Sequence, residues 1–131
     1  MLSSSTLQLL DEVCSQSHLA YPEGGALWTY VEAANQAHTR FKDARSTGPD
    51  PTTGTNGLAK WFQWAVGDRD ATQRGSVEAA TRLVASVRRD LSFDDLLLLI
   101  EEGGSDMRAV LHMARYADNR YFSLDLWWSE D

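Results

Sequence analysis

The sequence predicts a compact all-α domain, a bundle of five or six helices, and three observations favour this class. In most segments apolar residues recur at three- and four-residue spacing, as they do on the buried face of a helix. Capping residues and charges that suit the helix dipole stand at the ends of these segments. Residues 96–100 are five consecutive aliphatic side chains, so a helix here would be apolar on every side. We expect this run to form a buried central helix.

The predicted central helix covers residues 93–102, and both of its ends carry helix signals. Ser92 stands in the N-cap position, and Asp95 follows three residues later, as in a capping box. Gly103 offers a left-handed C-terminal stop. Periodicity over five residues cannot separate a helix from a short buried strand. Leucines rather than β-branched residues, together with the caps, favour the helix.

Other helices are predicted around this one from the same spacing. They run from Ser5 to about Ser17, from Ala26 to Ala44, over residues 58–66, from Asp70 or Ser76 to Arg89, and from Ser105 over residues 107–114. Residues 121–128 fit a strand and also fit a continuation of the preceding helix, so this segment stays open between the two.

A length of 131 residues predicts one domain, covering residues 1–131. Residues 46–57 are turn-forming throughout and predict an irregular surface loop, without the glycine and lysine spacing of a phosphate-binding loop. The single cysteine, Cys14, excludes an internal disulfide and fits a reducing compartment. With no apolar run long enough to cross a bilayer and no export signal, we expect a soluble cytoplasmic protein that binds no membrane.

The formal charge of −7 is concentrated in the last third of the chain. Residues 1–89 hold nine acidic and nine basic side chains, whereas residues 90–131 hold ten acidic and three basic ones. A nucleic-acid partner is therefore not expected, because such binding needs a clustered cationic face. An acidic surface suits attraction to a partner with a basic surface.

Tryptophans and neighbouring carboxylates supply the candidate partner-binding residues. Trp64 lies off the apolar stripe of its segment, where the preceding loop could also cover it. Trp127 and Trp128 are adjacent, so they point in different directions, although both could complete the core. Aromatic anchors with an acidic rim are typical of protein-binding hot spots. The predicted binding residues are Trp64, Asp125, Trp127, Trp128, Glu130 and Asp131.

No catalytic motif, cofactor fingerprint or metal-ligand spacing is found along the chain. Asp68 and Asp70 are spaced like the first ligands of a calcium loop, but the sixth position is Gln73 and the twelfth is Ala79. We therefore expect no metal, no cofactor and no catalytic residue. An acid–base site remains open only if histidines such as His38 and His112 meet a carboxylate across helices.

These observations favour a small acidic protein-binding inhibitor, such as an immunity protein or an antitoxin that occludes a toxin. The alternative is a structural or adaptor subunit that forms a homo-oligomer through exposed aromatics. An enzyme with a histidine and carboxylate pair is a third, less favoured hypothesis.

Overall fold

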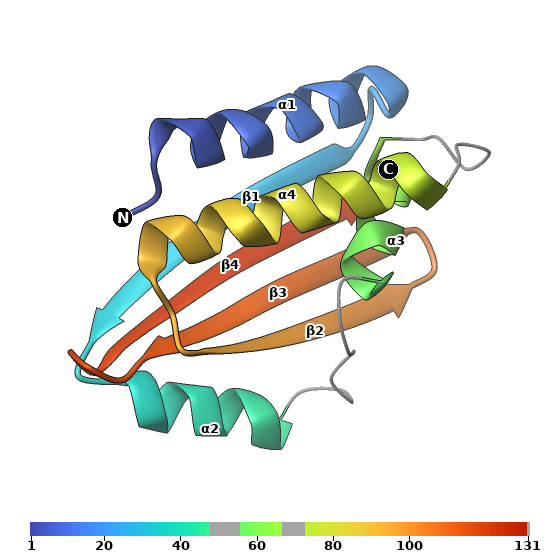
Figure 1. Cartoon of the computed structure of the whole chain (residues 1–131). Coiled ribbons are helices and arrows are strands. Elements are labelled where there is room, and N and C mark those ends of the chain that lie inside the picture. The colour runs from blue at the N-terminus through green and yellow to red at the C-terminus, as the bar shows by residue number, and fades with distance from the viewer. Residues whose placement is uncertain (48–55, 67–72, 131) are drawn as a thin grey trace.

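The computed structural model describes residues 1–47, 56–66 and 73–130, which form a mixed α/β fold (Figure 1). In chain order the elements are α1 (Ser4–Ala20), β1 (Gly25–Ala34), α2 (Ala37–Thr47), α3 (Asn56–Ala65), α4 (Gln73–Leu91), β2 (Asp95–Gly103), β3 (Asp106–Arg115) and β4 (Arg120–Ser129). The described strands form one antiparallel sheet in the order β1-β4-β3-β2. Figure 1 shows α1, α3 and α4 over one face of the sheet and α2 beneath the other. The predicted all-α bundle is therefore wrong.

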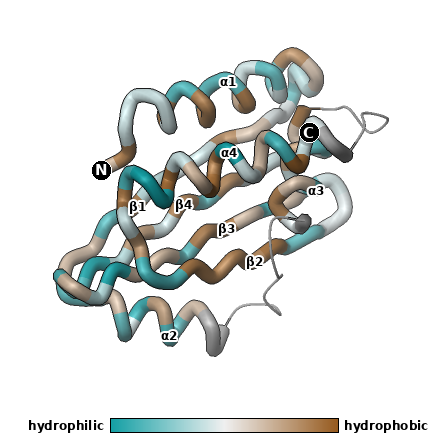
Figure 2. The backbone as a smooth tube through the Cα atoms, in the orientation of Figure 1, coloured by the Kyte–Doolittle hydropathy of each residue, from teal (hydrophilic) through white to brown (hydrophobic). Residues whose placement is uncertain are grey.

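The aliphatic run forms the edge strand β2 rather than a central helix. Leu98 packs into the main core on the side of α3 and α4, whereas Leu97 and Leu99 pack into a second cluster with α2. All three are buried, with exposed fractions of 6–7%. Side chains on both faces of the strand are thus apolar, because helices cover both faces. Figure 2 shows the resulting hydrophobic stretches along β2 and β3.

Of the residues interpreted as caps of a central helix, Ser92 follows α4, whereas Asp95 and Gly103 are the first and last residues of β2. Ser92 adopts a left-handed φ of 49° and its N–H donates to the carbonyl of Arg88 at 2.8 Å, so it ends α4. Gly103 pairs with Asp106 across the sheet, which leaves a two-residue loop between β2 and β3. Gly104, the first loop residue, has a φ of 54°, as the glycine position of a tight hairpin requires.

The helix predicted over Ala26–Ala44 is instead a strand followed by a shorter helix. β1 pairs with β4 without a bulge, and its aromatic and β-branched residues suit a strand. Asn35, with a φ of 61°, turns the chain after β1. The side-chain oxygen of Asn119, in the β3–β4 turn, accepts from the N–H of Ala37 at 3.1 Å. This bond caps the start of α2 from another part of the chain.

The helix predicted after Ser105 is β3, and the open segment 121–128 is part of the strand β4. β3 lies between two other strands and both of its faces are covered in part. Apolar residues therefore point to both faces of β3, and some of them fall at three- and four-residue spacing by coincidence. For this reason the spacing of Met107, Val110, Leu111 and Ala114 wrongly predicted the buried face of a helix.

The remaining helices agree with their predictions in type. Cys14 lies half-buried on α1, where burial, together with the charge of Asp11, raises the pKa of its thiol to about 11. In the described part of the chain, no helix has the length and apolar character needed to span a membrane. Of the predicted loop 46–57, residues 48–55 lie outside the described residues, and its ends belong to α2 and α3.

Candidate functional site

The strand register arranges the α2 side of the sheet in rows of residues. One row near the β2–β3 hairpin contains Leu27, Trp127, Arg108 and Glu101, taken from β1 to β2. The next row contains Thr29, Asp125, Val110 and Leu99, and the third contains Val31, Ser123, His112 and Leu97. Each row crosses the whole sheet, so residues distant in sequence lie together.

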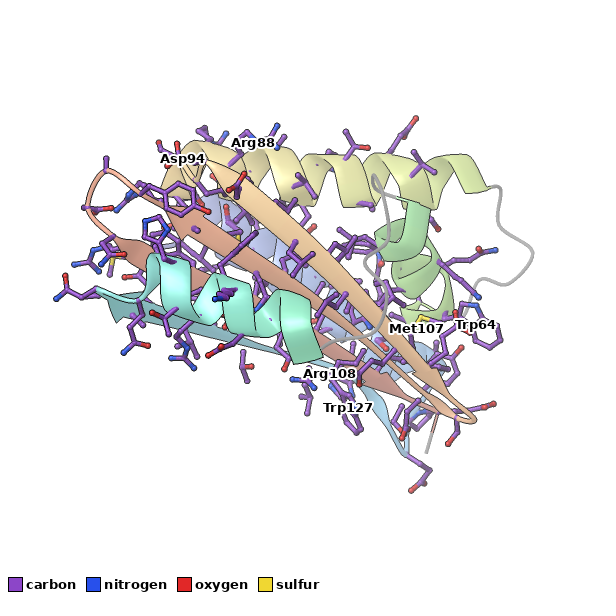
Figure 3. The ribbon with its side chains drawn as sticks, turned by 90° about the horizontal axis from the view of Figure 1, so that it is seen from below. Trp64, Arg88, Asp94, Met107, Arg108 and Trp127 are labelled. Atoms are coloured by element: carbon purple, nitrogen blue, oxygen red, sulfur yellow. The ribbon has the colours of Figure 1, made fainter. Side chains whose placement is uncertain are left out.

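Helix α2 covers only part of this face. Its buried residues Ala37, Phe41 and Ala44 pack with Leu97, Leu99 and Ala114 of β2 and β3. Beyond the helix lies a surface that we call the open patch, composed of Leu27, Thr29, Val31, Arg108, Asp125 and Trp127. Figure 3, seen from the α2 side, places Arg108 and Trp127 beside the end of α2.

The open patch exposes three large apolar side chains on adjacent strands. Leu27 is 55% exposed, Val31 is 46% exposed and Trp127 is 40% exposed. Leu27 and Trp127 are direct register partners, and with the ion pair described next they line a shallow groove of about 310 Å³. Contiguous exposed apolar groups framed by polar ones mark interaction surfaces on soluble proteins.

The polar part of the patch is an ion pair between Arg108 and Asp125. Nε of Arg108 donates to both carboxylate oxygens at 3.0 Å, and its Nη2 donates to Oδ2 at 2.5 Å. The hydrogen bonds to Asp125 raise the pKa of the Arg108 guanidinium above its usual value. Asp125 therefore presents a compensated charge to a partner, rather than the free carboxylate expected from sequence.

Further acidic side chains lie toward the β2–β3 hairpin end of the sheet. Glu101 occupies the same row as Trp127, and Asp106 and Glu130 lie near it around the β2–β3 hairpin. The backbone N–H of Glu130 donates to the carbonyl of Ser105 at 2.8 Å, which fixes the C-terminal segment against this hairpin. Part of the acidic excess of the last third thus lies at the end of the sheet that holds the exposed tryptophan.

The predicted binding residues fall on two sides of the sheet. Asp125 and Trp127 come together in the open patch, and Glu130 is exposed beyond its end. Trp128 points to the opposite face, where it is 2% exposed and packs against Tyr21 and Trp64 with ring centroids 5.1 and 5.8 Å apart. Asp131 lies outside the described residues.

Sequence reasoning missed Leu27, Thr29, Val31 and Arg108. The first three alternate along β1 with Trp28 and Tyr30, which is strand periodicity within a segment interpreted as a helix. Arg108 was not singled out among the three basic residues of the last third. Only strand pairing places it opposite Trp127 and within reach of Asp125.

The two histidines considered for catalysis have separate aromatic partners. His38 is exposed on α2 and stacks on Tyr116 with ring centroids 4.5 Å apart. Nδ1 of His112 on β3 lies 2.5 Å from the hydroxyl of Tyr121 on β4. Among the described residues, no group of three or more histidine, cysteine or acidic side chains is placed to hold a metal ion.

We predict that His112 titrates below its ordinary pKa of 6.5, because burial, and then the charge of Arg108, disfavour the imidazolium. The unfolded chain then binds a proton that the folded chain does not. The contribution of neutral His112 to the free energy of unfolding should therefore be fully present above pH 6.5. The free energy of unfolding should decrease as the pH falls below 6.5. A proton NMR titration of the ring would check the direction, and a midpoint above that of an unfolded peptide would contradict it.

Comparison of this chain with protein-family models, with curated proteins and with solved structures gives no match.

Proposed function

We propose that this chain is a small protein-binding inhibitor, such as an immunity protein or an antitoxin, and that its partner docks on the open patch. The observation that carries this proposal is the exposure of Leu27, Val31 and Trp127 on two adjacent strands, on a sheet face that α2 covers only in part. A partner that covered them would remove a large apolar area from water. Trp127 is the expected anchor, because tryptophan is enriched among residues that dominate binding energy.

Charge supports a partner with a basic surface. The chain carries a formal charge of −7. Asp106 pairs with Ser129, two residues after Trp127, and Glu101 lies in the row of Trp127, two strands away. Carboxylates at the edge of an interface accelerate association with a basic partner and lose this effect as salt screens them. The Arg108–Asp125 pair supplies donors and acceptors inside the patch, which favours a partner of defined geometry over nonspecific adsorption.

We place this activity in the cytoplasm, in line with the single cysteine.

The test uses proteins encoded beside this chain, each co-expressed with it and isolated as a complex. For a complex that forms, Trp127→Ala should weaken binding by about 30-fold or more, as expected for a hot-spot residue worth about 2 kcal/mol. Leu19→Ala is the matched control, because Leu19 is 84% exposed but lies on α1. Glu101→Lys should slow association at low salt and should have little effect at high salt.

Equal binding by the wild-type, Trp127→Ala and Leu19→Ala chains would contradict docking on the open patch. If Leu19→Ala alone weakened the complex, the binding surface would lie on α1. For the inhibitor function itself, the bound neighbour must have a measurable toxic or enzymatic activity that the wild-type chain suppresses. A neighbour that binds and stays fully active would contradict it.

A further inference from the structure

A groove lies between α1 and α4, on the face of the sheet opposite the open patch. Figure 1 shows these two helices running in opposite directions over that face. Near the start of α1 they are held together, because the backbone N–H of Ser3 donates to Oδ2 of Asp90 at 3.0 Å. Thr6 Oγ1 and Ser86 Oγ lie 2.6 Å apart beside this contact. These hydrogen bonds fix the separation of the two helices that border the groove.

The section of the groove next to α3 is mainly apolar and has a volume of about 290 Å³. Apolar residues of α1, of α4 and of the end of α3 line it, among them Leu9, Val13, Phe62, Val66, Ala79 and Leu83. Leu9, Val66 and Ala79 are half-buried, so part of their apolar surface remains available to a ligand. A mainly apolar cavity of this size falls at the lower end of the range for small-molecule sites.

The section of the groove farther from α3 is polar, with a volume of about 610 Å³. Polar residues of α1 and α4 line it, among them Ser5, Gln8, Glu12, Arg82, Ser86 and Arg89. Leu9, Glu12 and Arg82 line both sections, so the two form one continuous cavity, which we call the interhelical groove. Arg82 and Arg89 are about two turns apart on α4, so both stand on the same side of this helix.

The charges that line the interhelical groove favour an anion. Among the described lining residues, α4 contributes the guanidinium groups of Arg82 and Arg89, α1 contributes the carboxylate of Glu12, and α3 contributes no charge. Glu12 Oε1 already accepts from Gln8 Nε2 at 3.1 Å. Asp90 lies beneath the polar section, but its carboxylate is 5% exposed and engaged by α1. The groove therefore carries a positive balance in a chain of formal charge −7.

We propose that the interhelical groove binds a medium-chain aliphatic carboxylate, with its hydrocarbon chain in the apolar section and its carboxylate between Arg82 and Arg89. The succession of an apolar and a basic section within one cavity carries this inference. Burial of methylene groups supplies affinity, and guanidinium groups pair with carboxylates through two N–H donors. The site goes beyond the proposed function, because it lies on the side of the sheet opposite the open patch and needs no protein partner.

Isothermal titration calorimetry of the purified full chain with octanoate and decanoate, both kept below micelle formation, tests the apolar section. Each added methylene should tighten binding about fourfold, so decanoate should bind about 15-fold more tightly than octanoate. Ala79→Phe should abolish decanoate binding, because the ring would fill this section. Val77→Phe is the matched control, since Val77 is 37% exposed on the same helix and is not among the described residues that line the groove.

Ligands with the same hydrocarbon chain and another head group test the polar section. Decanoate should bind about fivefold or more tightly than decanol, as expected for an exposed charge pair, and decyltrimethylammonium should bind most weakly. The double variant Arg82→Gln, Arg89→Gln should lose this preference while keeping its affinity for decanol. Arg88→Gln should retain the preference, because the Arg88 guanidinium lies over the ring of Phe93, 5.2 Å from its centroid, and not in the groove.

Equal affinities for octanoate and decanoate, or for decanoate and decanol, would overturn the proposal. Unchanged decanoate binding in Ala79→Phe would overturn it as well, and so would loss of the head-group preference in Arg88→Gln alone. Vesicles of phosphatidylglycerol provide acyl chains and anionic head groups in a membrane. A chain that sediments with these vesicles but does not bind monomeric decanoate would assign the groove to a lipid surface instead. None of these outcomes bears on the binding of a protein to the open patch.

Discussion

Replacing Trp61 by alanine is expected to lower the free energy of unfolding by about 4 kcal/mol, the cost of emptying a large core site. Trp61 on α3 is fully buried, and its Nε1 donates to the carbonyl of Met107 on β3 at 3.2 Å. Its ring also packs edge-on against Phe62, with centroids 5.3 Å apart. The substitution would therefore remove the contact that ties α3 to the sheet.

Urea unfolding followed by circular dichroism would measure this loss. Trp61→Phe should recover part of it, since the phenyl ring refills much of the indole site but restores neither its full volume nor the hydrogen bond. Trp127→Ala is the matched control, because it removes an indole that is 40% exposed and should cost well under half as much. Equal losses of unfolding free energy in Trp61→Ala and Trp127→Ala would contradict the placement of Trp61 in the core and of Trp127 at the surface.

Asp90→Ala is expected to lower the free energy of unfolding by about 3 kcal/mol, as for the loss of several hydrogen bonds to a buried charge. Its carboxylate, near the end of α4, is 5% exposed. Oδ2 accepts from the backbone N–H of Ser3 at 3.0 Å, from Ser3 Oγ at 2.9 Å and from Thr6 Oγ1. Thr6 Oγ1 also lies 2.6 Å from Ser86 Oγ. One side chain thus anchors the start of α1, where Ser3 is the N-cap.

The pH dependence of stability should identify this contribution. Burial alone would raise the pKa of Asp90, but the hydrogen bonds from Thr6 and Ser3 outweigh it and lower the pKa below 3.8. The ionised carboxylate therefore stabilises the fold fully above pH 3.8, and this stabilisation is lost as the pH falls through the lowered pKa. The difference between wild type and Asp90→Ala should shrink in strong acid.

Asp11→Ala provides a comparison for this effect, because Asp11 is exposed and accepts one bond, from Trp28. Its cost should be below 1 kcal/mol, as for other surface carboxylates. An Asp90→Ala chain as stable as the Asp11→Ala chain at neutral pH would show that the anchor of α1 lies elsewhere.

The sequence allowed some elements of the fold to be predicted, and the reasons for the errors are physical. Amphipathic helices with one exposed face, such as α1 and α4, keep a helical period because only one stripe is buried. Strands covered on both faces lose their alternation, so β2 and β3 resembled buried helices. Ser92 and Gly103 were wrongly interpreted as caps of a central helix, because the residues that bound strands and tight turns are similar to those of helix caps.

The candidate site depended on strand pairing and could be predicted only in part. Asp125 and Trp127 were selected because an aromatic residue beside acidic ones is typical of binding surfaces. Arg108 and Leu27 are distant from them in sequence, and they join the site only through the register of β3 and β1 with β4. The opposite orientation of Trp127 and Trp128 follows from alternation along β4, once this segment is known to be a strand.

The central claim is that Trp127 faces solvent on the open patch while its neighbour Trp128 lies in the core, with exposed fractions of 40% and 2%. Acrylamide quenching of tryptophan fluorescence tests it directly in the chains Trp127→Phe and Trp128→Phe. We predict that Trp127→Phe lowers the quenching constant of the chain and that Trp128→Phe does not. Lower quenching in Trp128→Phe, with Trp127→Phe unchanged, would contradict the assignment and the binding surface built on it.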